Sequence, residues 1–211
     1  MSALCARLHE IVRNGSIFSF GDDLKAIPKN GIYIMFEKNE FAHGGNRIVR
    51  IGTHTGEGQL PSRIFQHFEN ENKNRSIFRK NIGRCILNRE QSDYLPVWDL
   101  DTTSRKGKER SIALVDEKFE TAIEKRITRY VQENLTFSIL EIPSKNNRLF
   151  LEARLIGTVS GCDECSPSKS WLGNFSTKEK IRKSGLWQVN ELHSPPISEK
   201  DLESLANLLI R

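Results

Sequence analysis

The sequence predicts an α+β fold, in which a small group of short strands packs against helices. Residues 31–36 (GIYIMF) and 47–53 (RIVRIGT) are rich in β-branched and aromatic side chains, and the polar letters HGGN lie between them. This pattern is typical of an antiparallel hairpin. Residues 137–142 (FSILEI) form a third apolar run, and Pro143 directly after it suits the end of a buried strand.

Helices are predicted on both sides of the hairpin. In residues 3–13 the apolar side chains recur at helical spacing, and Asn14 and Gly15 provide a stop signal. Residues 60–68 show the same spacing. Within this second helix Arg63 and His67 lie four positions apart, so we expect both side chains on one side, converging on one phosphate.

Three further helices are predicted in the second half of the chain. Asp116 has the residue type of an N-cap, and the helix after it carries one apolar stripe that should face the core. That stripe consists of Phe119, Ile123, Ile127, Tyr130 and Val131. Residues 149–159 form the next helix, and a near capping box of Ser198 and Asp201 opens a terminal one.

The remaining segments are predicted to be mostly loop. Residues 69–110 are rich in Asn, Lys and Arg and contain only short apolar islands. Within them, residues 102–110 (TTSRKGKER) have the composition of a mobile basic loop. Residues 161–185 are also loop-like, because Ser, Gly and Pro recur there.

The length of 211 residues suits one domain with extensions. We expect residues 1–30 to form an N-terminal helix and connector, and residues 31–176 to form the main domain with a basic insert near 70–115. Residues 177–211 are expected to be a C-terminal extension packed on the same domain.

Composition and charge narrow the class of protein. A hydrophobic content of 37% and a charged content of 28% favour a folded chain. No apolar stretch approaches the roughly 20 residues that span a bilayer, and the N-terminus does not resemble a secretory signal. We therefore expect a cytoplasmic protein without membrane contact. The net charge of +5 favours a polyanionic partner, although a solvated basic surface would give the same value.

Four cysteines are present, at Cys5, Cys85, Cys162 and Cys165. In a cytoplasmic protein we expect them to be reduced. The two-residue gap between Cys162 and Cys165 occurs in zinc and redox sites, but a closed zinc site needs four ligands. The sequence has no second pair with this spacing, and His193 is one candidate for a further ligand. A zinc-stabilised regulatory DNA binder and a loop with two free thiols both remain open.

Five short motifs follow one another along the chain. They are Gly31-Ile32-Tyr33, Arg50-Ile51-Gly52, Arg63-Ile64-Phe65-Gln66-His67, Phe150-Leu151-Glu152-Ala153 and Leu172-Gly173-Asn174. Their order, with the element order strand, strand, helix, helix, strand, helix, resembles the GIY-YIG nuclease superfamily. The resemblance covers residues 31–174. It implies a small three-stranded antiparallel sheet flanked by helices, and metal-dependent hydrolysis of DNA phosphodiester bonds.

The resemblance also implies roles for individual residues. Tyr33 matches the tyrosine of the first half of the motif, Arg63 the arginine of the first helix, and His67 the histidine one turn later. Glu152 matches the single metal-binding glutamate, and Asn174 matches the late asparagine. The residue types fit the reaction, which needs an activated water, a stabilised phosphorane and a neutralised leaving oxygen.

Arg50 departs from the family pattern, which has tyrosine at this position. A free phenol has a pKa of about 10 and is a poor base near neutrality, but a nearby cation favours the phenolate. We expect Arg50 to supply that cation to Tyr33. The resemblance further implies Mg²⁺ or Mn²⁺ on Glu152, and a non-bridging phosphate oxygen on the planar fork of Arg63.

The basic insert is expected to hold the DNA backbone, because phosphate contacts give affinity without sequence specificity. The expected contacts are Arg75, Arg79, Lys80 and Arg84. The compact chain favours the restriction-enzyme branch, and a restriction role would favour a homodimer that matches a symmetric site. A DNA-repair or mobile-element nuclease fits the motifs as well. The Arg50 departure keeps another class open, a catalytically idle module that binds nucleic acid or protein.

Overall fold

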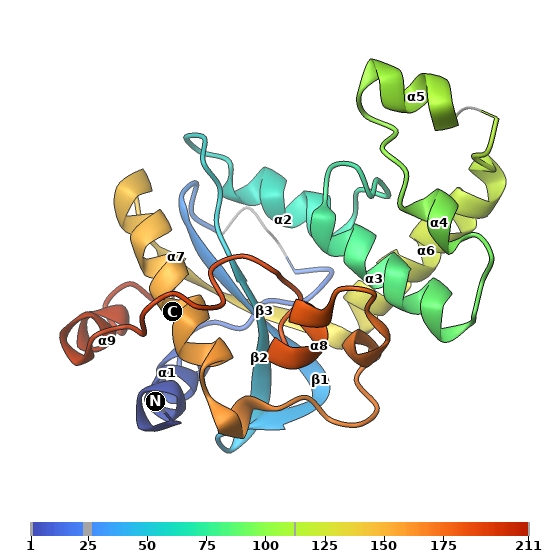
Figure 1. Ribbon diagram of the computed structural model, residues 1–211. Helices are drawn as coiled ribbons and strands as arrows, with labels where there is room; N and C mark the ends of the chain where they lie inside the picture. Colours follow the sequence, from blue (N-terminus) through green and yellow to red (C-terminus); the bar gives the residue numbers. More distant parts are fainter. Residues whose placement is uncertain (1, 23–26, 112, 211) are drawn as a thin grey trace.

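The structure, a computed structural model, describes residues 2–22, 27–111 and 113–210. A three-stranded antiparallel sheet with the strand order β2-β1-β3 forms its centre (Figure 1). Strands β1 (Gly31–Ala42) and β2 (Gly45–Gly52) form the hairpin, and β3 (Leu135–Glu141) pairs with the other edge of β1. The predicted α+β class, with a small antiparallel sheet flanked by helices, is confirmed.

Helices cover both faces of the sheet (Figure 1). Tyr33 and Met35 of β1 pack into one buried cluster, whereas Ile32 and Ile34 pack into the other, as the alternation of side chains along a strand requires. A strand buried on both faces needs apolar side chains at successive positions, which the GIYIMF run provides. The first cluster includes residues of α2 (Leu60–Phe68), α3 (Ile77–Arg89) and α6 (Glu117–Asn134), and the second includes residues of α1 (Ser2–Arg13), α7 (Lys145–Ser160) and α9 (Glu199–Leu205).

The helix caps read from the sequence are confirmed. The Asp116 carboxylate accepts the backbone N–H of Phe119 at 3.0 Å, and the Ser198 hydroxyl accepts that of Asp201 at 3.1 Å. Most of the predicted stripe on α6 is in the core. Phe119 is the exception, since it is 36% exposed and packs on Tyr94 with ring centroids 4.5 Å apart. The buried members are Ile123, Ile127 and Val131.

Some predicted boundaries are wrong. The first strand extends well beyond residue 36, to Ala42, because the hairpin turn needs only His43 and Gly44. Both turn residues have positive φ, 50° and 76°, as a two-residue turn of the primed type requires. Helix α7 begins at Lys145, one turn before residue 149, and Ser144 caps it.

Four helices were missed in the segments predicted as loop. They are α3, α4 (Leu95–Trp98), α5 (Arg105–Ser111) and α8 (Glu179–Ser184). The basic run at residues 102–110 lacks an apolar face, so α5 gave no periodic signal; an exposed Arg105–Glu109 pair at 3.2 Å bridges its turns. The side chains of Lys108 and Arg110 lie outside the described part. Within the described ranges, no helix is long and apolar enough to cross a membrane.

Candidate active site

A cleft opens beside the last residues of β2. It consists of two hollows of about 270 and 210 Å³, and Glu152 lines both of them. Arg63 lines the first hollow, and Arg50 lines the second. Glu152 therefore stands between two guanidinium groups that come from different elements, α2 and β2.

Glu152 is held in place by the backbone of the strand end. Its Oε1 atom accepts the N–H of Thr53 at 2.9 Å. Burial raises the pKa of the Glu152 carboxyl, while the Arg50 guanidinium acts in the opposite direction. Glu152 lies two turns into α7, so the helix dipole, which acts in the first turn, does not account for a carboxylate here.

Tyr33 lies behind this cleft in a buried hydrogen-bonded row. Its hydroxyl is 2.8 Å from Nε2 of His67, and Nε of Arg50 donates to it over 3.3 Å. Gly52, which pairs with Tyr33 across the hairpin, allows this packing, because a Cβ at Gly52 would come within 2.2 Å of the phenol oxygen. The last glycine of the second half-motif thus makes room for the tyrosine of the first.

His67 is a weak base in this environment. Burial lowers the pKa of His67 well below 6.5, and the charges of Arg50, Arg63 and Arg79 lower it further. The neutral ring is satisfied on both sides, with Nδ1 2.8 Å from the hydroxyl of Ser76. His67 and Arg63 were expected to converge on one phosphate, but His67 is fully buried and turns toward Tyr33 instead.

Arg63 remains at the cleft, where its NH1 group donates to Oε1 of Gln66 at 3.1 Å and to the carbonyl of Arg75 at 3.3 Å. Only one of its terminal nitrogens is engaged by these contacts. Among the described residues, no carboxylate forms an ion pair with Arg63. The guanidinium is therefore available to an anion in the first hollow.

The C-terminal part of the chain completes the site. Arg50 donates through NH1 to the carbonyl of Trp187 at 2.6 Å, and Ile51 donates its N–H to Oε1 of Gln188 at 3.0 Å. Trp187 itself is anchored by its indole N–H on Glu37, 2.8 Å away. Asn190 lines the second hollow with Glu152. Sequence reasoning missed this segment, because its distance along the chain gives no signal of its contact with β2.

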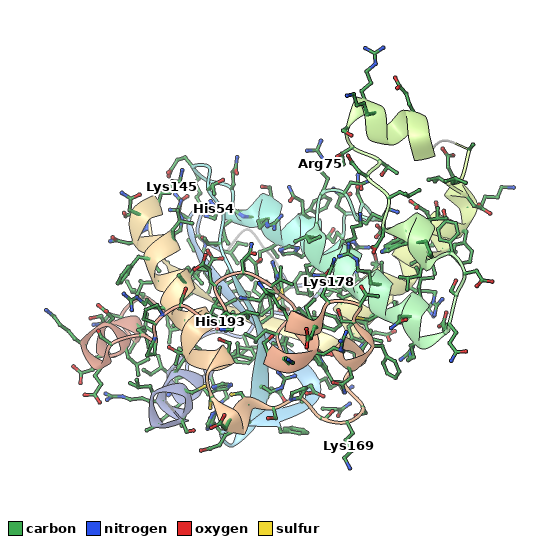
Figure 2. All side chains as sticks on the ribbon, viewed as in Figure 1. His54, Arg75, Lys145, Lys169, Lys178 and His193 are labelled. Carbon is green, nitrogen blue, oxygen red and sulfur yellow. The ribbon has the colours of Figure 1, made fainter. Side chains whose placement is uncertain are left out.

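Asn174 is not at the cleft. Its side-chain amide donates to the carbonyls of Ser168 and Lys169, at 2.9 and 3.1 Å, and it lines neither hollow. In the view of Figure 2, Lys169 and the cleft residue His54 lie at opposite ends of the molecule. The expected catalytic role of Asn174 is therefore replaced by a local one, in which it holds its own loop.

The basic residues expected to contact DNA divide into two groups. Arg75 is exposed, and Lys80 is partly exposed. Arg79 is fully buried and pairs with Glu124 at 2.7 Å, and Arg84 pairs with Asp99. Burial of Arg79 corrects the expectation that it meets phosphate: its guanidinium stabilises the contact between α3 and α6.

The donor set of the cleft fits a hard divalent cation. Glu152 offers its second carboxylate oxygen, Oε2, which accepts no hydrogen bond from the described residues. Thr53, Thr55 and Ser62 add hydroxyl groups to the lining. Mg²⁺ binds through one or two carboxylates, with water and substrate phosphate as the other ligands, so one glutamate in an open polar cleft suffices.

Comparison with known proteins agrees with the fold and the motifs. Searches of curated proteins and of solved structures gave no match. A family model described as the GIY-YIG domain, in contrast, matches residues 2–210, nearly the whole chain. That family generally comprises endonucleases. The chain belongs to the GIY-YIG domain family.

Proposed function

We propose that this protein is a metal-dependent DNA endonuclease. The observation that carries the proposal is the position of Glu152, whose carboxylate lies in a polar cleft between Arg50 and Arg63, with the buried Tyr33–His67 pair behind it. Phosphodiester hydrolysis needs cationic groups at the phosphate and a carboxylate for the metal, and this cleft offers both. Family membership supports the same reaction type.

In the proposed reaction, Arg63 binds a non-bridging phosphate oxygen through its free nitrogens. Tyr33 accepts the proton of the attacking water. Because Tyr33 is fully buried next to Arg50, the bound phosphate must first draw the Arg50 guanidinium toward itself and admit water to the phenol. A divalent ion on Glu152 would neutralise the leaving oxygen. His67 accepts the hydrogen bond of Tyr33 and fixes its direction, since its lowered pKa makes it a poor proton acceptor.

The DNA backbone is proposed to cross the mouth of the cleft. In Figure 2, the exposed residues Arg75 and Lys145 lie on either side of His54, at the end of the molecule that carries the cleft. Arg75 is also tied to the site, since its carbonyl accepts a hydrogen bond from Arg63. Lys80 extends the proposed contact on α3, whereas the buried Arg79 is left out of it.

The proposal is tested by incubating supercoiled plasmid and phage DNA with the protein and Mg²⁺ or Mn²⁺. Discrete fragments would indicate the restriction-type enzyme that the compact chain favours, and a smear would indicate a non-specific nuclease. DNA that stays intact although it is bound would refute the enzyme proposal and favour an idle binding module. A dimer in solution would agree with a restriction role.

A further inference from the structure

A second cluster of reactive side chains lies at the other end of the hairpin from the cleft. It brings together α1, the β1–β2 turn and the short helix η2 (Asp163–Cys165). The ligand atoms of Cys5, His9, His43 and Cys165 all lie within 4.8 Å of one another. Strand β2 separates this cluster from the cleft by on the order of 20 Å, so the proposed reaction does not use these residues.

Cys162 joins the same cluster. Its Sγ atom is 3.3 Å from Nε2 of His43, and the Sγ atoms of Cys5 and Cys165 are 3.5 Å apart. Around a tetrahedral zinc ion, with Zn–S near 2.3 Å and Zn–N near 2.0 Å, neighbouring ligand atoms lie roughly 3.3–3.8 Å apart. The observed separations therefore match the edges of a zinc tetrahedron.

His9 is excluded as a ligand by its hydrogen bonds. The backbone N–H of Ile48 donates to Nε2 of His9 at 3.1 Å, so the ring proton must be on Nδ1, where the carbonyl of Cys5 accepts it at 2.9 Å. Both ring nitrogens are thus in use, and neither has a lone pair free for a metal.

His43 has the opposite arrangement. Its Nδ1 atom faces the carboxylate of Glu164 at 3.4 Å, which leaves the lone pair of Nε2 directed at the cysteines. A carboxylate behind a histidine is the usual partner of a zinc-bound imidazole. The His43 side chain is only 3% exposed, although it occupies a turn position with positive φ that favours Asn or Gly.

We propose that this chain holds one structural Zn²⁺, distinct from the metal of the cleft, in a Cys₃His site. The ligands are Cys5, His43, Cys162 and Cys165. The ion would tie the N-terminal helix and the segment after α7 to the turn of the hairpin, and its binding would release the three thiol protons. The sequence pair Cys162–Cys165 thereby gains the two ligands that spacing alone did not supply.

The test is the metal content of the full chain, expressed without a histidine tag in medium with zinc, together with a count of free thiols after denaturation. We expect roughly one zinc per chain and a lower melting temperature after chelation. A zinc-free protein with four titratable thiols, or with a Cys5–Cys165 disulfide found by peptide mass spectrometry, would overturn the proposal.

Variants identify the ligands. Cys165→Ser and His43→Asn should each lower the zinc retained at least about tenfold, while Cys85→Ser and His9→Gln should retain it. If ligand variants do not fold, Co²⁺ replaces zinc in the chelator-treated wild type, and a thiolate-to-cobalt charge-transfer band is expected. Absence of that band, or loss of zinc in His9→Gln equal to that in His43→Asn, would contradict the proposed ligand set. Zinc content should be unchanged in Glu152→Gln, which separates this test from that of the nuclease.

Discussion

Replacing Arg79 with methionine tests whether this arginine belongs to the scaffold or to the DNA interface. In the structure it is fully buried and donates to Glu124 Oε2 at 2.7 and 3.0 Å, to Thr128 at 2.7 Å and to the carbonyl of His67 at 3.1 Å. Methionine fills a similar volume but leaves the Glu124 carboxylate and these oxygens without their donor.

The expected cost follows from this geometry. Removing one partner of a buried ion pair costs about 3–5 kcal/mol, because the remaining charge stays buried without compensation. For a chain of this size, each kcal/mol lowers the melting temperature by about 2–4 °C, so Arg79→Met should melt about 6–20 °C below the wild type.

Urea unfolding and thermal unfolding measure this loss, and Arg75→Met is the matched control. Arg75 is exposed, so its replacement should change stability by at most about 0.5 kcal/mol, yet lower the salt dependence of DNA binding by roughly 0.9 for one lost phosphate contact. Our reasoning about burial would be refuted if Arg79→Met lost less than 1 kcal/mol and instead lowered the salt slope.

Three further predictions concern the site. Tyr33→Phe removes the proposed proton acceptor and should slow DNA cleavage by about 10²–10⁴-fold in single-turnover assays; an unchanged rate would exclude it. Arg63→Lys keeps the charge but loses the planar fork, so cleavage should fall at least about tenfold, and full activity would show that bidentate binding is not needed. Because the pKa of His67 is lowered by burial and by the nearby arginines, its contribution to stability is present above about pH 6.5 and is lost as the pH falls toward the folded-state pKa, at up to about 1.4 kcal/mol per pH unit. Urea unfolding at pH 5–7 should show that His67→Gln removes this part of the slope and that the exposed His193→Gln does not; equal slopes in wild type and His67→Gln would contradict the buried neutral ring.

The elements that were predictable from sequence are those whose signal is local. Residues 31–36 and 60–68 carry their own periodicity, and Asp116 and Ser198 cap the helices that directly follow them. Helix α3 gave no such signal, because it is buried around most of its circumference, including at Arg79. Helix α5 gave none for the opposite reason, since it has no apolar face.

The cleft was predictable only in part, because burial and pairing depend on distant segments. The motif located Tyr33 and Glu152, but the buried position of Arg79 follows from Glu124, 45 residues away along the chain. Asn174 matched a motif letter, yet its amide bonds within its own loop. The cysteine cluster shows the same limit, since Cys5 and Cys165 are 160 residues apart.

The central claim is that Glu152 binds the metal ion that cleavage requires. The most direct measurement compares single-turnover cleavage of plasmid DNA with Mg²⁺ by wild type, Glu152→Gln and a matched control, Glu57→Gln, whose exposed carboxylate lines neither hollow. We predict that Glu152→Gln loses at least about a hundredfold in rate while DNA binding is retained, and that Glu57→Gln cleaves like the wild type. Undiminished cleavage by Glu152→Gln would remove this residue from the site and contradict our account.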